Sequence, residues 1–125
     1  MRHQELKELL NTRKFFKLVC GAGNEDAVEI EKLTFLYTLA GANGFDVSAS
    51  AEIVQAAKKG IKKAYAAAKE HGAKIKNEPF ITVSIGMRGD PHVRKALINE
   101  KCIQCGACVT VCPTSAISNE QGSHT

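Results

Sequence analysis

The fold is decided by residues 15–50, which read FFKLVCGAGNEDAVEIEKLTFLYTLAGANGFDVSAS. The apolar run Phe15–Cys20 is rich in Phe and is closed by glycines, which is typical of a buried strand followed by a tight turn. Asn24 is expected to cap a helix that stops at Gly41. A short strand, GFDVSA, then starts at Gly44. The stretch therefore predicts a strand, a helix and a second strand in succession.

Each helix of this region is predicted to cover the sheet through one apolar face. Glu25 and Asp26 follow Asn24 in the first turn, where acidic side chains suit the positive end of the helix dipole. Ser50 is expected to cap a second, longer helix, and Gly72 to end it. The apolar positions are Val28, Leu33, Leu36, Tyr37 and Ala40 in the first helix, and Ile53, Val54, Ala57, Ile61, Ala64, Tyr65 and Ala68 in the second.

Outward from this stretch, the run FITVSIG from Phe80 predicts a third strand, and Gln4–Leu10 predicts a short amphipathic helical arm. Strands that alternate with helices indicate parallel βαβ units. The predicted fold class is α/β, a parallel βαβαβ sheet that is partly barrel-like, with a C-terminal ferredoxin-type module. We expect an α/β domain over residues 1–97 and an iron–sulfur module, truncated or complete, over residues 98–125.

Three parallel strands cannot close a barrel, which takes eight, so the sheet is expected to be thin and open. Such a sheet pairs with another copy of the chain, pairs with another protein, or belongs to a longer chain.

Composition limits the classes of function. The chain has 125 residues, of which 44% are hydrophobic and 24% charged, and its net charge is +4. These values favour a folded soluble protein and do not favour a nucleic-acid partner. The sequence shows no secretory signal and no apolar run that could cross a membrane, so we expect a cytoplasmic location. Cysteines that cluster in a reducing compartment bind metal or do redox work more often than they form disulfides.

Four of the five cysteines stand in the run KCIQCGACVTVCPTSAI, which starts at Lys101. Cys102, Cys105, Cys108 and Cys112 have the spacing C-x2-C-x2-C-x3-C, followed at once by proline, as in bacterial ferredoxins. The short gaps let the backbone wrap around one cuboidal cluster. The run predicts one [4Fe–4S] cluster, with an apolar shell from Ile103, Val109 and Ile117.

Alternatives remain open for this run. Structural zinc usually takes two CxxC pairs separated by a long spacer, which this run lacks. In two-cluster ferredoxins the fourth cysteine binds the other cluster, so the fourth ligand is Cys112, Cys20 or a residue outside the chain, or the cluster has three irons. Cys20 is alternatively a small buried apolar residue.

Other polar residues carry weaker signals. Asp90 followed by proline is typical of a helix start, so the segment reads first as a short connecting helix. Its functional interpretation is an anion site formed by Asp90, His92 and Arg94 near the C-terminal end of the third strand. Asp46, in the second strand, is expected at a sheet edge facing water.

The chain resembles the N-terminal part of the cyanobacterial light-dependent period protein family, iron–sulfur proteins of the circadian input pathway. The matching stretches are FFKLVCGA, LTFLYTLAGANGFDVSAS, FITVSIGMRGDPHVRKA and CPTSAI. The resemblance implies a barrel-like α/β half with a ferredoxin-type module that senses redox state or transfers electrons. It also implies that Asp46, Asp90, His92 and Arg94 are family features.

The function predicted from the sequence is one-electron transfer or redox sensing by an iron–sulfur protein with a redox partner protein. One alternative is an electron-feeding component of an oxidoreductase, with a substrate site at the C-terminal strand face. The other is a zinc-stabilised interaction module.

Overall fold

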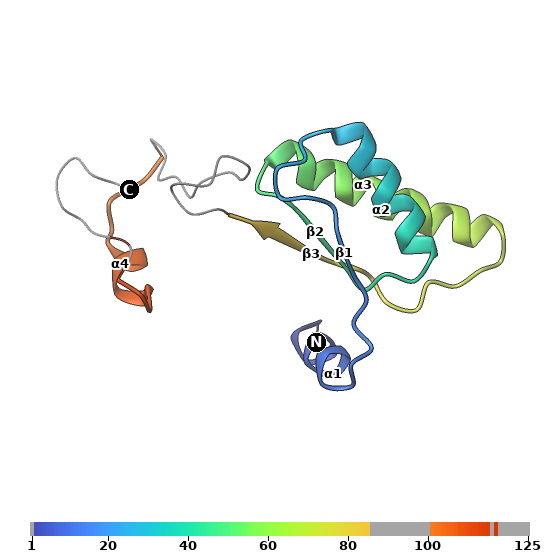
Figure 1. Cartoon of the computed structure of the whole chain (residues 1–125), viewed down its shortest axis with the longest axis horizontal. Helices are drawn as coiled ribbons and strands as arrows, with labels where there is room; N and C mark the ends of the chain where they lie inside the picture. Colours follow the sequence, from blue (N-terminus) through green and yellow to red (C-terminus); the bar gives the residue numbers. More distant parts are fainter. Residues whose placement is uncertain (1, 86–100, 116, 118–125) are drawn as a thin grey trace.

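The computed structural model describes residues 2–85, 101–115 and 117. Its elements are α1 (Arg2–Asn11), β1 (Lys17–Val19), α2 (Ala27–Leu39), β2 (Gly44–Ser48), α3 (Ala51–Glu70), β3 (Phe80–Ser84) and α4 (Ala107–Val111). The strands form one parallel sheet in the order β1-β2-β3 (Figure 1). The predicted mixed α/β fold with a parallel sheet is confirmed. Within the described residues this sheet has three strands, and a barrel-like arrangement is not confirmed.

Helices α2 and α3 lie side by side over one face of the sheet (Figure 1). Side chains alternate between the two faces of a strand, so Phe45 and Val47 of β2 both point toward the helices. Both are fully buried, and they form one cluster with Ile30 of α2 and Ile53 of α3. The core therefore lies between the central strand and the helix pair.

The two helices approach each other most closely at Gly60 of α3. A methyl group placed on Gly60 would lie 2.1 Å from Thr34 Oγ1 and 2.3 Å from the Glu31 carbonyl oxygen, both in α2. Alanines flank the contact on α3, and the hydroxyls of Thr34 and Thr38 donate to carbonyls one turn earlier in α2. These hydrogen bonds within α2 satisfy the buried hydroxyls, so the two threonines can face α3 without an unpaired polar group in the core.

The predicted apolar face of α2 is only partly right, because Leu33 and Tyr37 are partly buried against the core but the other predicted residues are exposed. Its buried residues are Ile30, Thr34 and Thr38, whereas Val28 and Leu36 are 62% and 57% exposed. This helix is apolar almost all the way round, so periodicity selects no single face. The close contact at Gly60 requires small side chains, so the threonines face α3 whereas Leu36 and Leu39 are exposed. The apolar stripe of α3 is largely confirmed, since only Val54 and Tyr65 of the predicted set fall outside its buried residues.

Two local predictions also need correction. Asp26, not Asn24, caps α2, because its carboxylate accepts hydrogen bonds from the N–H groups of Val28 and Glu29 at 2.9 and 3.0 Å. β1 is an exposed edge strand of three residues, whereas a buried strand was predicted. It is exposed because α2 and α3 cover only one face of the sheet and because β1 pairs with a neighbouring strand, β2, along only one of its edges.

The ends of α3 agree with the sequence in part. Ser50 occupies the N-cap position of α3 but its hydroxyl makes no capping bond, while Gly72 ends that helix with a φ of +66° as predicted.

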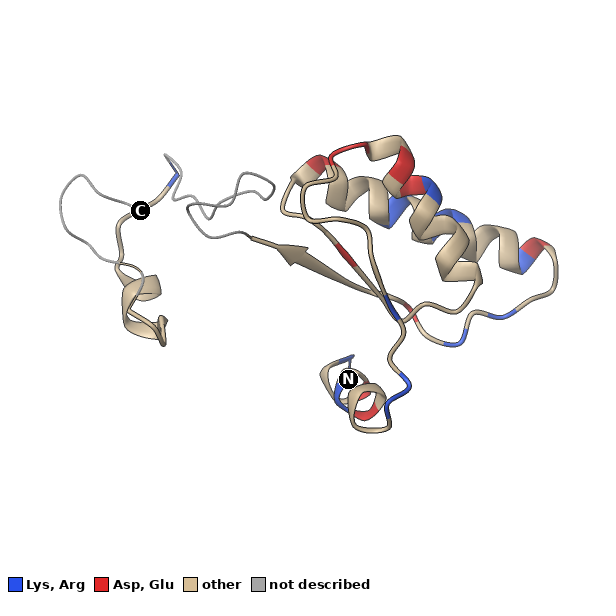
Figure 2. Cartoon of the chain, viewed as in Figure 1, with Lys and Arg blue, Asp and Glu red and all other residues tan. Residues whose placement is uncertain are grey.

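The amphipathic arm is confirmed as α1, which contacts the beginning of β3. Arg2 forms an ion pair with Glu78 at 2.9 Å, and its guanidinium lies 4.3 Å from the centre of the Phe80 ring. Phe80 in turn packs against Phe15, the residue that leads into β1. Charges are spread along α2 and α3 and are absent from α4 (Figure 2). Within the described residues, no helix is both long and apolar enough to cross a bilayer.

Replacing Gly60 with alanine tests the close helix contact. We expect Gly60→Ala to lower the free energy of unfolding by about 1–3 kcal/mol, because the added methyl group overlaps backbone atoms of α2. Helix propensity alone would favour alanine over glycine by about 1 kcal/mol, the opposite sign. Urea unfolding measures the difference. Ala66→Gly, at an exposed position of the same helix, is the control and should cost about 1 kcal/mol. A more stable Gly60→Ala chain would contradict the packing.

Candidate metal centre

The cysteine run combines exposed thiols with a tightly turning backbone. Cys102, Cys105 and Cys108 are exposed and Cys112 is half-buried. Cys108 lies in α4, and Cys112 caps the C-terminal end of that short helix. Gln104, Gly106 and Ser115 all have a left-handed backbone, with φ of +53°, +73° and +52°. These turns bend the chain repeatedly within a few residues, as a loop that wraps around one object must.

Two contacts in the run concern sulfur. The Gln104 N–H donates to Cys102 Sγ at 3.4 Å, and Cys112 Sγ lies 3.6 Å from Thr114 Oγ1. Hydrogen bonds of this kind stabilise negative charge on a thiolate and influence the reduction potential of an iron–sulfur cluster. Of the predicted apolar shell, Val109 and Ile117 are half-buried, whereas Ile103 is 84% exposed.

The four thiols are suitable ligands for an iron–sulfur cluster, although they do not converge on one point in this structure. No three Cys, His, Asp or Glu side chains within the described ranges lie close enough together to hold a metal ion. Ligands commonly converge only when the metal binds, because a preformed site rarely exists without it. Four soft thiols with two- and three-residue gaps and glycine at the tightest turn fit a [4Fe–4S] cluster in donor chemistry.

Cys20 lies apart from the run, in the core of the α/β part. It is 8% exposed and belongs to the buried cluster that includes Phe45 and Ile53. Burial in this apolar environment raises the pKa of its thiol, and the nearby carboxylates of Asp46 and Glu29 raise it further. The raised pKa keeps the thiol protonated, as expected of a small apolar core residue.

Asp46 does not face water at a sheet edge, as the sequence suggested. It lies on the central strand β2, on the face opposite the helices, with a side chain only 14% exposed. Its carboxylate accepts hydrogen bonds from Lys17 Nζ of β1, at 3.0 Å, and from Ser84 Oγ of β3. Sequence reasoning missed both partners. Strand register is the signal that locates them, because Lys17 and Ser84 lie two positions from the residues paired with Asp46.

Asp90, His92 and Arg94 lie outside the described residues, as does Gly86, which was expected to stop the third strand.

Comparison with known proteins supports the cluster type that the cysteine spacing predicts. The family described as 4Fe-4S binding domain matches residues 96–118, a range that contains all four cysteines of the run. Light dependent period A from Synechococcus elongatus (strain ATCC 33912 / PCC 7942 / FACHB-805) is 35% identical over 138 aligned residues, which cover 88% of this chain. The match covers only 38% of that relative's length. No solved structure matches the chain. The resemblance seen in the sequence and the [4Fe–4S] cofactor are confirmed.

The carboxylate of Asp46 should link stability to pH. Desolvation is the largest influence on its pKa and raises it, but the bonds from Ser84 and Lys17 and the Lys17 charge outweigh this, so the pKa is lowered. A carboxyl with a lowered pKa in the folded state stabilises the fold above its unfolded pKa of about 4, and this contribution is lost as the pH falls through the folded pKa.

We therefore expect Asp46→Asn to cost about 1–3 kcal/mol of unfolding free energy at pH 7, because it removes hydrogen bonds to a charged group. The difference from wild type should shrink below a pH of about 4. Urea unfolding of both chains at each pH measures it, and acid effects common to both chains cancel. Glu70→Gln, at an exposed position of α3, should show neither effect. A constant difference at all pH values would contradict the proposed pKa.

Proposed function

We propose that this chain is an iron–sulfur protein that undergoes one-electron redox change, as an electron carrier or as a redox sensor. The observation that carries the proposal is the C-x2-C-x2-C-x3-C-P run within the matched range 96–118. We propose Cys102, Cys105 and Cys108 as three ligands of the cluster and Cys112 as the fourth. The bound cluster would supply a site that accepts or gives up single electrons.

The chain's own residues would shape that site in three ways. Deprotonated thiols provide the negative charge that iron requires. Gly106 adopts the left-handed backbone that a side chain would strain, so the loop can approach closely and point N–H groups toward sulfur. Val109 and Ile117 are half-buried, a position from which apolar side chains limit access of water and tune the potential. The Gln104 N–H already bonds to Cys102 Sγ and would help to hold that ligand in place.

We further propose a division into an α/β domain over residues 1–97 and a cluster module over residues 98–125, and a cytoplasmic location. Ile103 and Val111 beside the cysteines are 84% and 76% exposed. Exposed apolar side chains next to a redox site favour contact with a partner protein. The relative's name ties it to light, and a redox signal is a chemistry through which light could act on a protein of this kind.

Cysteine variants test the ligand set. Wild-type chain purified without oxygen should contain about four irons and four sulfides, and Cys102→Ala, Cys105→Ala and Cys108→Ala should each lose most of both. Cys112→Ala should show the same loss if the fourth ligand is local. Iron, sulfide and zinc analysis measures the content of each variant.

Cys20→Ala is the matched control, since it removes a thiol from the core, and it should keep its full iron content. Zinc in place of iron in the wild-type chain would contradict the redox function. An equal loss of iron from Cys20→Ala would contradict the assignment of ligands.

A further inference from the structure

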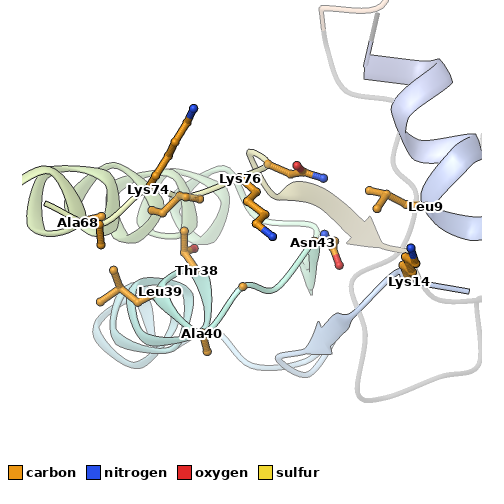
Figure 3. Close-up of a pocket in the computed structure, with 13 residues that line it drawn as sticks. Leu9, Lys14, Thr38, Leu39, Ala40, Asn43, Ala68, Lys74 and Lys76 are labelled. Atoms are coloured by element: carbon orange, nitrogen blue, oxygen red, sulfur yellow. The ribbon is translucent and has the colours of Figure 1, made fainter.

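A pocket of about 460 Å³ lies at the end of the α/β part where the two long helices finish. Its walls come from Leu9 of α1, the end of α2, Asn43 before β2, and the loop Lys74–Asn77 before β3 (Figure 3). The volume is within the range of sites that hold small molecules. None of its lining residues belongs to the cysteine run, so it is separate from the ligands proposed for the cluster.

The electrostatics of this pocket are one-sided. Its lining includes Lys14, Lys74 and Lys76, and none of its 13 lining residues is Asp or Glu. No side chain of these three lysines forms a hydrogen bond or ion pair within the described part of the chain, although other lysines do, such as Lys59 with Glu31 at 2.9 Å. In Figure 3 the side chain of Lys76 extends toward Asn43, whereas that of Lys74 points away. Unpaired ammonium groups beside an apolar wall favour a negatively charged occupant.

Asn43 contributes a neutral donor to the same place. Its side-chain oxygen accepts the Phe16 N–H at 2.8 Å, and this bond fixes the orientation of the amide. The amide nitrogen then remains available as a donor, because it makes no hydrogen bond within the described residues. Leu9 lies on the α1 side of the pocket and Leu39 on the α2 side, with Lys76 and Asn43 between them (Figure 3).

Helix dipoles offer a purely structural explanation for the lysines, because α2 and α3 both end here with partial negative charge. Three carbonyls in the last turn of each helix are, however, already bonded to backbone N–H groups. Ala42 N–H donates to Tyr37 O and Ala73 N–H donates to Ala68 O, both at 2.8 Å. Two helix ends carry about one negative charge in total, whereas Lys14 and Lys76 together carry two positive charges. The lining residues therefore carry a net positive charge.

We propose that this pocket binds a small organic anion, with a phosphate or carboxylate group held by Lys14, Lys76 and the Asn43 amide and a compact apolar body against Leu9. Ammonium groups act as point charges and accept either anionic group, so the shared chemistry is an anionic oxygen on an apolar carrier.

Amide chemical shifts of the intact, cluster-loaded chain test the proposal by titration with hexyl phosphate, hexanoate and inorganic phosphate at constant ionic strength. We expect saturable shifts at Asn43 and at the loop Lys74–Asn77. Hexyl phosphate and hexanoate show which anionic group is preferred, and hexyl phosphate should bind more tightly than inorganic phosphate. The double variant Lys14→Gln with Lys76→Gln should weaken binding at least about tenfold, because each lost ion contact removes part of the electrostatic attraction.

Two matched variants keep this test decisive. Lys32→Gln with Lys58→Gln removes the same charge from exposed helix positions away from the pocket and should leave binding unchanged. Lys14→Arg with Lys76→Arg keeps the charge and should retain binding. If no probe gives saturable shifts at the pocket, or if both glutamine pairs weaken binding equally, the lysines serve only the helix ends or general solubility and the proposal is wrong.

Discussion

The close contact between α2 and α3 at Gly60 is the constraint on which the rest of the α/β part depends. A side chain at this position would collide with the backbone of α2. The helices can therefore lie this close only because Gly60 has a hydrogen atom in place of a side chain. At that distance only small residues fit between the helices, and the threonines of α2 fill the space with hydroxyls bonded inside their own helix. The pair then covers the central strand, and Phe45 and Val47 are fully buried beneath it.

Because α2 and α3 cover only one face of the sheet, the opposite face can carry polar side chains. Parallel sheets are usually covered on both faces, but here the face away from α2 and α3 carries the Lys17, Asp46 and Ser84 network across all three strands. On this face, which α2 and α3 do not cover, an ion pair and side-chain hydrogen bonds link each strand to its neighbour.

The sequence predicted the order of strands and helices, because β-branched runs, glycines and the long amphipathic α3 are strong local signals. It failed where tertiary contacts decide between similar choices. The apolar circumference of α2 gave no unique inward face. Asp26, the true cap of that helix, was assigned to the first turn because it follows another acidic residue, and Asn24 was taken as the cap instead. Asp46 was misplaced because sheet position depends on strand order, which local patterns do not contain. The cysteine run was readable since its ligand spacing is local, whereas the convergence of the thiols depends on the metal.

We propose that the cysteine run holds one [4Fe–4S] cluster that changes by a single electron. Electron paramagnetic resonance of the intact chain, purified without oxygen and recorded before and after reduction with dithionite, tests this most directly. We expect a signal that is absent before reduction and integrates to about one spin per chain after reduction, together with bleaching of a broad visible absorption. A colourless chain without a signal in either state would contradict the claim.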